Sequence, residues 1–218
     1  MTDQELLSYL ERFITPKRKR RFEEVLERRT KFVTVAIEDV FQMHNTSAVI
    51  RSCEVFGLQE AHVIEGRFGK RLDKNIAMGA QQWVDVHRYE SSKECIQTLR
   101  KQGYRIIATT PHNDSCLLHD FEIIDKTALF FGTEKEGLSQ EVLEEADGYL
   151  KIPMAGFTES LNISVSAAII LHDITAKLRI TELPWRLSLT EKLEKQLDWT
   201  KKSIKSIDDI LGRFNGTD

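Results

Sequence analysis

The sequence has few of the residues that mark several large classes of protein. Its 218 residues include only 3 Cys, at positions 53, 95 and 116, and no Cys-x-x-Cys pair. This pattern argues against a disulfide scaffold and against a zinc site, and it is typical of a reducing cytoplasm. No apolar run approaches about 18 residues, so we expect no membrane span. The polar and acidic start, MTDQE, predicts no signal peptide.

Several common nucleotide-binding and catalytic motifs are also missing. No G-x-G-x-x-G follows a predicted strand, which disfavours a dinucleotide-binding dehydrogenase. The absence of G-x-x-x-x-G-K-[ST] excludes a P-loop NTPase. The 6 histidines form no H-E-x-x-H and no cluster at metal-ligand spacing, so we expect no metal. The nucleophile elbow G-x-S-x-G is absent as well. An enzyme with this sequence would need a less common kind of site.

The residues that are present predict a folded chain with an uneven charge distribution. Hydrophobic side chains make up 41% of the sequence, enough to form a core and to exclude disorder. The net charge is -3, but residues 17–31 hold eight basic and three acidic side chains, a local charge of +5 that leaves -8 elsewhere. Such a block either binds a polyanion, with nucleic acid the first candidate, or forms a solvated helix face. Its arginines are Arg18, Arg20, Arg21, Arg28 and Arg29.

The middle of the chain alternates between strand-like and helix-like patterns. Strands are predicted at 32–37, 61–64, 83–86, 104–108, 128–131 and 149–152, and helices at 45–56, 92–102, 139–146 and 164–178. Asn45 is the expected cap of the first of these helices, and Gly57 and Gly103 are expected to end the first and second. Strands separated by helices predict an α/β fold, with a mainly parallel sheet and helices on both faces.

Helical extensions are predicted at both ends of the chain. Thr2 or Asp3 can cap a first helix, and Thr15-Pro16 begins a second that carries the basic block. Between residues 193 and 214 apolar side chains recur at steps of four and three, with Thr200 in the missing place. This pattern predicts one amphipathic helix whose seam packs on the chain's own body or on a partner. The expected domains are 1–31, 32–180 and 181–218.

Three segments carry polar residues where a core would be expected. Residues 43–57 (MHNTSAVIRSCEVFG) place Asn45 and Arg51 six residues apart on one predicted helix. Residues 131–139 (FGTEKEGLS) follow a predicted strand, at the end where open α/β sheets bind ligands. Residues 152–168 (IPMAGFTESLNISVSAA) lead into a helix of small residues whose first N–H groups point outward. Taken singly, Asn45 is more often a plain helix cap and Arg51 a surface arginine, and the charged residues of 131–139 can form a solvated turn.

In this order and spacing, the three segments resemble the motifs of the SpoU class of RNA 2′-O-ribose methyltransferases. The resemblance covers roughly residues 18–180, and the run RFEEVLERR at 21–29, followed by Thr34-Val35, resembles the TrmH branch. That branch methylates the ribose of a guanosine in the D-loop of tRNA. The resemblance implies a SPOUT fold with a C-terminal trefoil knot, a cytoplasmic homodimer, and S-adenosylmethionine held in the knot.

The resemblance also implies roles for individual residues. Cofactor binding falls to Thr109, Gly132, Ile152, Met154 and Leu161. Catalytic or RNA-handling positions are matched by Arg51, Glu134, Ser160 and Asn162, with Asn45 supporting Arg51, while His44 joins the arginines of residues 1–31 in RNA binding. Because a guanidinium is a poor base, we expect Arg51 to grip a phosphate beside the reacting hydroxyl. A phosphate oxygen or a water molecule would then accept the proton.

Two positions depart from the TrmH pattern. Met43 stands where the branch often has Pro, and Glu159 stands where it often has Gln. A carboxylate near the RNA would repel phosphate unless it is paired, so Glu159 puts in doubt which RNA is the target and not the methyl-transfer chemistry. The alternatives are the same methyl transfer on ribosomal RNA or at another tRNA position, and a non-catalytic RNA-binding protein of the same fold. The last would be expected to have lost Arg51 or Asn162, and neither is lost.

Overall fold

The computed structural model describes residues 2–39, 43–66, 79–111 and 115–216, which form two compact units. The larger unit is Thr30–Trp185, and the smaller combines Met1–Arg29 with Arg186–Asp218. In chain order the larger unit contains β1 (Val33–Glu38), α3 (Met43–Phe56), β2 (Glu60–Ile64), η2 (Ala80–Gln82), β3 (Asp85–Tyr89), α4 (Ser92–Lys101), β4 (Arg105–Thr109), β5 (Cys116–Leu117), η3 (Leu118–Asp120), β6 (Thr127–Phe131), α5 (Gln140–Glu145), β7 (Gly148–Lys151) and α6 (Ile163–Arg179).

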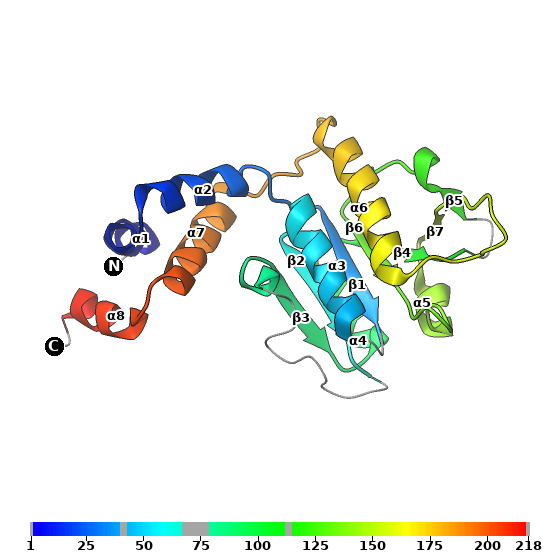
Figure 1. Ribbon diagram of the computed structural model, residues 1–218, viewed down its shortest axis with the longest axis horizontal. Helices are drawn as coiled ribbons and strands as arrows, with labels where there is room; N and C mark the ends of the chain where they lie inside the picture. Colours follow the sequence, from blue (N-terminus) through cyan, green and yellow to red (C-terminus); the bar gives the residue numbers. More distant parts are fainter. Residues whose placement is uncertain (1, 40–42, 67–78, 112–114, 217–218) are drawn as a thin grey trace. The chain divides into compact units, whose positions relative to one another are not determined.

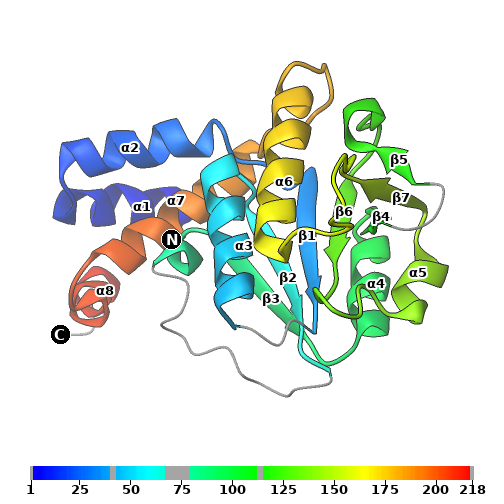
Figure 2. The same ribbon diagram turned by 45° about the vertical axis from the view of Figure 1, so that its right-hand side comes forward.

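The strands of the larger unit form one parallel sheet in the order β3-β2-β1-β6-β4-β7-β5. Side chains of β1 alternate between its faces: Val35 and Ile37 pack with α3 and α6, whereas Ala36 packs with α4 and α5. The two helix pairs lie on opposite faces of the sheet (Figures 1 and 2). The prediction of a parallel sheet covered on both faces is therefore confirmed.

Local signals explain where several of these elements begin and end. The Ser91 hydroxyl caps α4 by accepting the N–H of Glu94 at 3.2 Å. Gly57 and Gly103 follow α3 and α4 with φ of +86° and +83°, a left-handed conformation that favours glycine. Both predicted helix ends are confirmed.

The predicted strand at 83–86 lies further along the chain, over Asp85–Tyr89. Residues 80–82 form the turn η2, so pairing with β2 starts only at Asp85, opposite Glu60. The two-residue strand β5 was not predicted, because two residues are too few to show an alternating pattern.

The smaller unit is helical, with α1 (Asp3–Leu10), η1 (Glu11–Phe13), α2 (Pro16–Leu26), α7 (Leu189–Ser203) and α8 (Ile207–Asn215). Thr2 forms a capping box at the start of α1, and Thr15 caps α2 with Pro16 in its first position, as predicted. Leu7 and Leu10 of α1 pack against Leu197 of α7. The C-terminal seam therefore contacts the N-terminal helices of its own chain.

The prediction of a single C-terminal helix is wrong. α7 ends at Ser203, Ile204 is extended, and Ser206 takes a left-handed φ of 54° before α8 begins. The apolar seam continues across this break, since Ile204 and Ile207 pack in the same cluster as Leu197. The periodicity predicted the buried face, but no Pro or Gly marks the break.

Within the described ranges, no helix combines the length and the apolar character needed to cross a membrane. The same residues contain no group of three His, Cys, Asp or Glu side chains that could hold a metal ion. All three cysteines are free thiols, with Cys116 exposed and the other two buried.

Candidate active site

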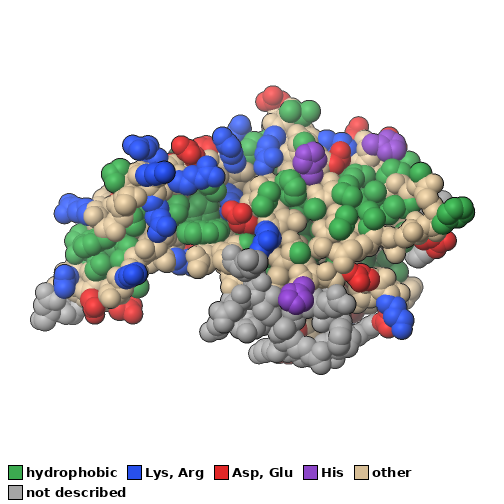
Figure 3. Space-filling view, in the orientation of Figure 1, with side chains coloured by type: hydrophobic (Ala, Val, Ile, Leu, Met, Phe, Trp, Pro, Cys, Tyr) green, Lys and Arg blue, Asp and Glu red, His purple; other side chains and the backbone are tan. Residues whose placement is uncertain are grey.

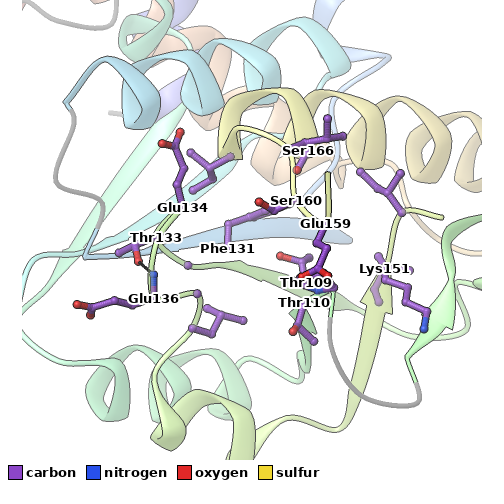
Figure 4. A pocket seen from close by; sticks show the side chains of 18 of the residues that line it. Thr109, Thr110, Phe131, Thr133, Glu134, Glu136, Lys151, Glu159, Ser160 and Ser166 are labelled. Carbon is purple, nitrogen blue, oxygen red and sulfur yellow. Dashed lines mark hydrogen bonds between the residues drawn. The ribbon is translucent and has the colours of Figure 1, made fainter. Parts of the chain in front are cut away.

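A pocket of about 320 Å³ opens at the carboxyl ends of three neighbouring strands. Its walls include Thr109 at the end of β4, Phe131 at the end of β6 and Lys151 at the end of β7 (Figure 4). Open α/β sheets bind ligands at this edge, beside the point where the strand order reverses. The residues expected to bind a cofactor all line this pocket, namely Thr109, Gly132, Ile152, Met154 and Leu161.

The loop after β6, residues 132–138 and hereafter the pocket loop, closes on itself. Thr133 and Gly137 each donate a backbone hydrogen bond of 3.0 Å to the other's carbonyl oxygen, and Gly137 has a φ of +71°. A Cβ atom on Gly132 would lie 2.2 Å from the carbonyl carbon of Gly137 and 2.3 Å from the nitrogen of Leu138. Since backbone atoms cannot turn aside as a flexible side chain can, position 132 requires glycine.

Three side chains expected at the active site form one hydrogen-bonded group, hereafter the amide–carboxylate cluster. Asn45 donates through Nδ2 to Glu134 Oε1 at 2.9 Å. Asn162 donates through Nδ2 to Asn45 Oδ1 at 3.2 Å and also to Glu134 Oε1. The Oδ1 atom of Asn162 accepts the N–H of Ser164 at 2.8 Å and so caps α6. The cluster joins α3, the pocket loop and the start of α6, and Figure 4 shows Glu134 extending from the pocket loop toward α3.

Asn45 differs from its predicted role as a helix cap. α3 begins at Met43, so Asn45 lies inside the first turn, where it is 8% exposed and bonded to Glu134 and Asn162. Arg51 lies six residues further on, about 240° around the helix axis and therefore on another face. No hydrogen bond joins Asn45 to Arg51, so the expected support of Arg51 by Asn45 is not a direct contact.

The other expected site residues are divided between the pocket and the surface. Ser160 lines the pocket from the loop before α6 (Figure 4). His44 is exposed in the first turn of α3, and Arg51 is exposed further along it. Arg51 does not line the pocket, and among the described residues it has no hydrogen-bond or ion-pair partner. A single chain thus brings Glu134 and Ser160 to the pocket wall, bonds Asn45 and Asn162 to Glu134, and leaves Arg51 outside the pocket.

Some basic side chains of the smaller unit are exposed, whereas others form an ion pair or are buried. Figure 3 shows Lys and Arg side chains gathered over α2, and those exposed on α2 and just after it are Lys17, Arg18, Arg20, Arg21 and Arg28. Lys19 instead bonds to Glu11, which raises the pKa of its ammonium group. Arg29 is 1% exposed, and its guanidinium carbon lies 5.5 Å from the ring centre of Trp199. Arg29, one of the residues expected to bind RNA, therefore packs inside the smaller unit in this structure, unlike the exposed arginines of α2.

The largest pKa shifts occur away from the pocket, on β2, β3 and α4. Burial, followed by repulsion from His87, lowers the pKa of His62 to about 3. Burial raises the pKa of Tyr89 to about 12 and also raises that of the Cys95 thiol. Loss of solvent is the main cause in each case, so these groups are uncharged at neutral pH and belong to the core.

Sequence reasoning missed part of the pocket wall. Thr110, Lys151 and Ser166 line it without belonging to an assigned role. The first two could have been found from their positions, because each lies at or directly after the carboxyl end of a strand. Glu159, noted only as a departure from the family pattern, also lines the pocket.

The parallel sheet and the pocket at its carboxyl edge define an α/β protein with a ligand site at that edge. Comparison with known proteins gives the family. The chain belongs to the SpoU rRNA Methylase family, whose model matches residues 32–172. It is 40% identical to a Borreliella burgdorferi protein named tRNA (guanosine(18)-2'-O)-methyltransferase, over 96% of each chain. A Thermus thermophilus protein of the same name is 36% identical over 86% of this chain and 98% of its own. Among solved structures, the A. aeolicus TrmH/SpoU tRNA modifying enzyme has a TM-score of 0.77 and 28% identity, over 87% of this chain and 98% of its own.

Proposed function

We propose that this protein transfers a methyl group from S-adenosylmethionine to the ribose 2′-hydroxyl of a guanosine in the D-loop of tRNA. Relatives that match most of the chain carry this activity in their names, at guanosine 18. The observation that carries the proposal is the amide–carboxylate cluster at the rim of a pocket lined by all five expected cofactor residues. Methyl transfer is the chemistry of the family, and this edge of the sheet is where we assign it.

The pocket fits S-adenosylmethionine in size and in charge. Its volume of about 320 Å³ lies within the range of small-molecule sites, roughly 300–1,000 Å³. Met154 and Leu161 offer apolar contacts. Three carboxylates, of Glu134, Glu136 and Glu159, outnumber the two lysines of the lining, and this balance favours a positively charged ligand. When bound, the cofactor supplies an electrophilic methyl group on a sulfonium ion.

The protein's own groups have two tasks, to orient the ribose and to help remove one proton. Both N–H groups of the Asn162 amide are directed at Asn45 and Glu134, so Asn162 holds the cluster together rather than contacting RNA. Within the described chain, Glu134 Oε2 has no hydrogen-bond partner, which leaves it available to the ribose hydroxyl. Ser160 can orient the ribose or its phosphate from the opposite loop.

Arg51 is assigned to the phosphate beside the reacting ribose. A guanidinium binds phosphate through two parallel hydrogen bonds and keeps its own proton at any physiological pH. It therefore stabilises the developing charge on the hydroxyl, while a phosphate oxygen or a water molecule takes the proton. The exposure of Arg51 on α3 makes it accessible to RNA.

Recognition of tRNA is assigned to the ends of the chain and to His44. Residues 1–31 form an RNA-binding extension through the exposed basic side chains of α2, and residues 32–180 form the methyltransferase domain. Residues 181–218 form a second helical extension, and α7 in it packs on α1 and α2. Repeated contacts with phosphates suit a helix with several exposed arginines.

The proposal includes a trefoil knot in the C-terminal part of the sheet and a homodimer. α3 and α6 leave Val55, Val165 and Ile169 exposed by 65%, 45% and 39%, and Figure 3 shows hydrophobic side chains over these helices. A second copy of the chain would remove this apolar surface from water. The reaction would take place in the cytoplasm, where tRNA is found and where the reducing environment keeps cysteines such as those of this chain as free thiols.

Transfer of labelled methyl from S-adenosylmethionine to unmodified tRNA, with mapping of the modified nucleotide, tests the proposed activity. We expect one D-loop guanosine to carry the label. Label in ribosomal RNA or elsewhere in tRNA would change the target and keep the chemistry, whereas transfer to neither RNA would refute the enzyme.

Calorimetry on metal-free protein tests the pocket. We expect Gly132→Ala to weaken binding of S-adenosylmethionine by about tenfold or more, because the new Cβ would meet the Gly137 backbone at 2.2 Å. Gly156→Ala is the matched control, since its Cβ would approach only the Thr158 nitrogen, at 4.0 Å. Equal affinities of both variants and the wild type would place the cofactor elsewhere.

A further inference from the structure

A buried carboxylate lies at the last residue of β1, behind the pocket loop. Glu38 is 3% exposed, and within the described residues no Lys, Arg or His pairs with it. Its Oε2 accepts the backbone N–H of Ser139 at 2.7 Å, and its Oε1 accepts the Ser139 hydroxyl at 2.6 Å. The Ser92 hydroxyl also donates to Oε1. A buried carboxylate is costly unless it is well hydrogen-bonded, and here three donors satisfy it.

The three donors come from two helices on the same face of the sheet. Ser92 is the first residue of α4, and Ser139 is the cap of α5, where its hydroxyl also accepts the N–H of Val142. Both helices pack in the core cluster that includes Ala36 of β1. Glu38 therefore ties the end of β1 to the beginnings of α4 and α5.

Ser139 directly follows the pocket loop. The loop begins at Gly132 after β6 and ends at Leu138, which is buried. Two backbone hydrogen bonds between Thr133 and Gly137 hold its ends close together. The Thr133–Gly137 pair fixes its inner shape, and the two bonds from Ser139 to Glu38 fix its exit. The same loop carries Gly132 of the pocket wall and Glu134 of the amide–carboxylate cluster.

We infer that Glu38 is a positioning residue that holds the pocket loop in the shape needed to bind S-adenosylmethionine and to present Glu134. The inference rests on the proposed function. Glu38 does not line the pocket, so it acts through Ser139 rather than on substrate. A carboxylate suits this position because both of its oxygens accept hydrogen bonds. A Gln side chain has one acceptor oxygen, so either the Ser139 N–H or the two serine hydroxyls would face an NH₂ group instead of their acceptor.

Limited proteolysis without cofactor tests the structural part. Lys135 is exposed within the pocket loop, so trypsin can cleave after it once the loop opens. We expect Glu38→Gln and Ser139→Ala to speed this cleavage about tenfold, since a hydrogen bond to a charged group changes an opening equilibrium by about that factor. Ser139→Thr keeps the hydroxyl and should cleave at the wild-type rate. Glu65→Gln is a second control. Glu65 directly follows β2, away from the pocket loop, and its carboxylate accepts hydrogen bonds from Arg88 of β3.

Binding of S-adenosylhomocysteine, measured by calorimetry, tests the functional part. We expect the dissociation constant to rise about tenfold in Glu38→Gln and Ser139→Ala, with tRNA affinity within about twofold of the wild type. Unchanged cleavage after Lys135 overturns the inference, and so does faster cleavage with unchanged cofactor affinity. If the wild type binds no cofactor at all, the proposed function fails, and the cleavage rates still decide whether Glu38 orders the loop. Should Glu38→Gln fail to fold, Ser139→Ala against Ser139→Thr decides.

Discussion

At the scale of single residues, the proposed chemistry depends most on Arg51. It follows Asn45 by six positions, roughly 9 Å along the α3 axis, and its side chain is exposed. A lysine at this position would carry the same charge as a point on a flexible chain. The planar guanidinium instead makes two fixed contacts with a phosphate, and so contributes geometry as well as charge.

We expect Arg51→Lys and Arg51→Ala both to lower single-turnover methylation by about two orders of magnitude or more, the usual loss for a key electrostatic group. Cofactor affinity should stay within about twofold, because Arg51 does not line the pocket. Rapid-quench assays with saturating tRNA measure the rate. Near-normal turnover of the Lys variant would show that charge alone suffices. Near-normal turnover of both would make Arg51 structural and transfer the catalytic role to Glu134.

The sequence predicted which residues surround the pocket but not how they pair. Gly132 and Asn162 could be assigned because each lies in a motif with fixed spacing. The bond from Asn45 to Glu134 joins residues 89 positions apart, and the bond from Ser139 to Glu38 spans 101. Such pairs depend on which strands become neighbours, which no local pattern encodes. The burial of Arg29 beside Trp199 likewise depends on a contact between residues far apart in the chain, here outside the sheet.

At the scale of elements, α2 offers the sharpest test of RNA binding. Replacing Arg18, Arg20 and Arg21 by Ala should weaken tRNA binding and reduce the slope of log affinity against log salt by about 2–3, since each phosphate contact contributes roughly 0.7–0.9. Cofactor affinity should not change, because these residues belong to the smaller unit. Filter binding at several salt concentrations measures the slope.

A triple variant of the other end of the chain is the control for this test. Lys201, Lys202 and Lys205 lie at the end of α7 and just beyond it, and their replacement by Ala removes the same charge. A similar loss of slope in both triple variants would mean that overall charge, rather than α2, attracts the RNA. An unchanged slope in the α2 variant would make its basic block a solvated face.

Element boundaries could be predicted wherever a residue with special backbone chemistry marks them. Thr15-Pro16 at the start of α2 and Gly103 after α4 are examples. The break between α7 and α8 falls at residues 203–206, Ser-Ile-Lys-Ser, where no Pro or Gly interrupts the apolar spacing. Ile204 and Ile207 pack in the same apolar cluster on either side of that break, so a pattern based on hydrophobic spacing cannot detect it.

At the scale of the whole molecule, the fold class was accessible from the sequence and the strand order was not. Alternating strands and helices predict a parallel sheet because each crossover helix must cover one face. Chain adjacency would place β4 beside β3, yet β3 forms one edge and β4 lies between β6 and β7. This long-range order brings the ends of β4, β6 and β7 together at the pocket.

The position of Arg51 outside its own pocket leads to a prediction about the homodimer. Arg51 and Val55 are both exposed on α3, one turn apart, and Val165 is exposed on the neighbouring α6. We predict that the proposed homodimer forms through this face and that Arg51 of each chain serves the pocket of the other. An active site would then combine Arg51 from one chain with Gly132, Glu134 and Asn162 from its partner.

Mixed dimers test this arrangement directly. Arg51→Ala and Gly132→Ala chains with different tags, co-expressed and purified through both tags, each lack a different half of the site. If the halves come from different chains, one of the two sites in every mixed dimer is intact, and the methylation rate should recover to roughly half of the wild-type rate. If each site lies within one chain, both sites stay defective and no activity returns. Light scattering that gives a monomer mass for the wild type would refute the homodimer itself, and Arg51 would then have to reach the ribose within its own chain.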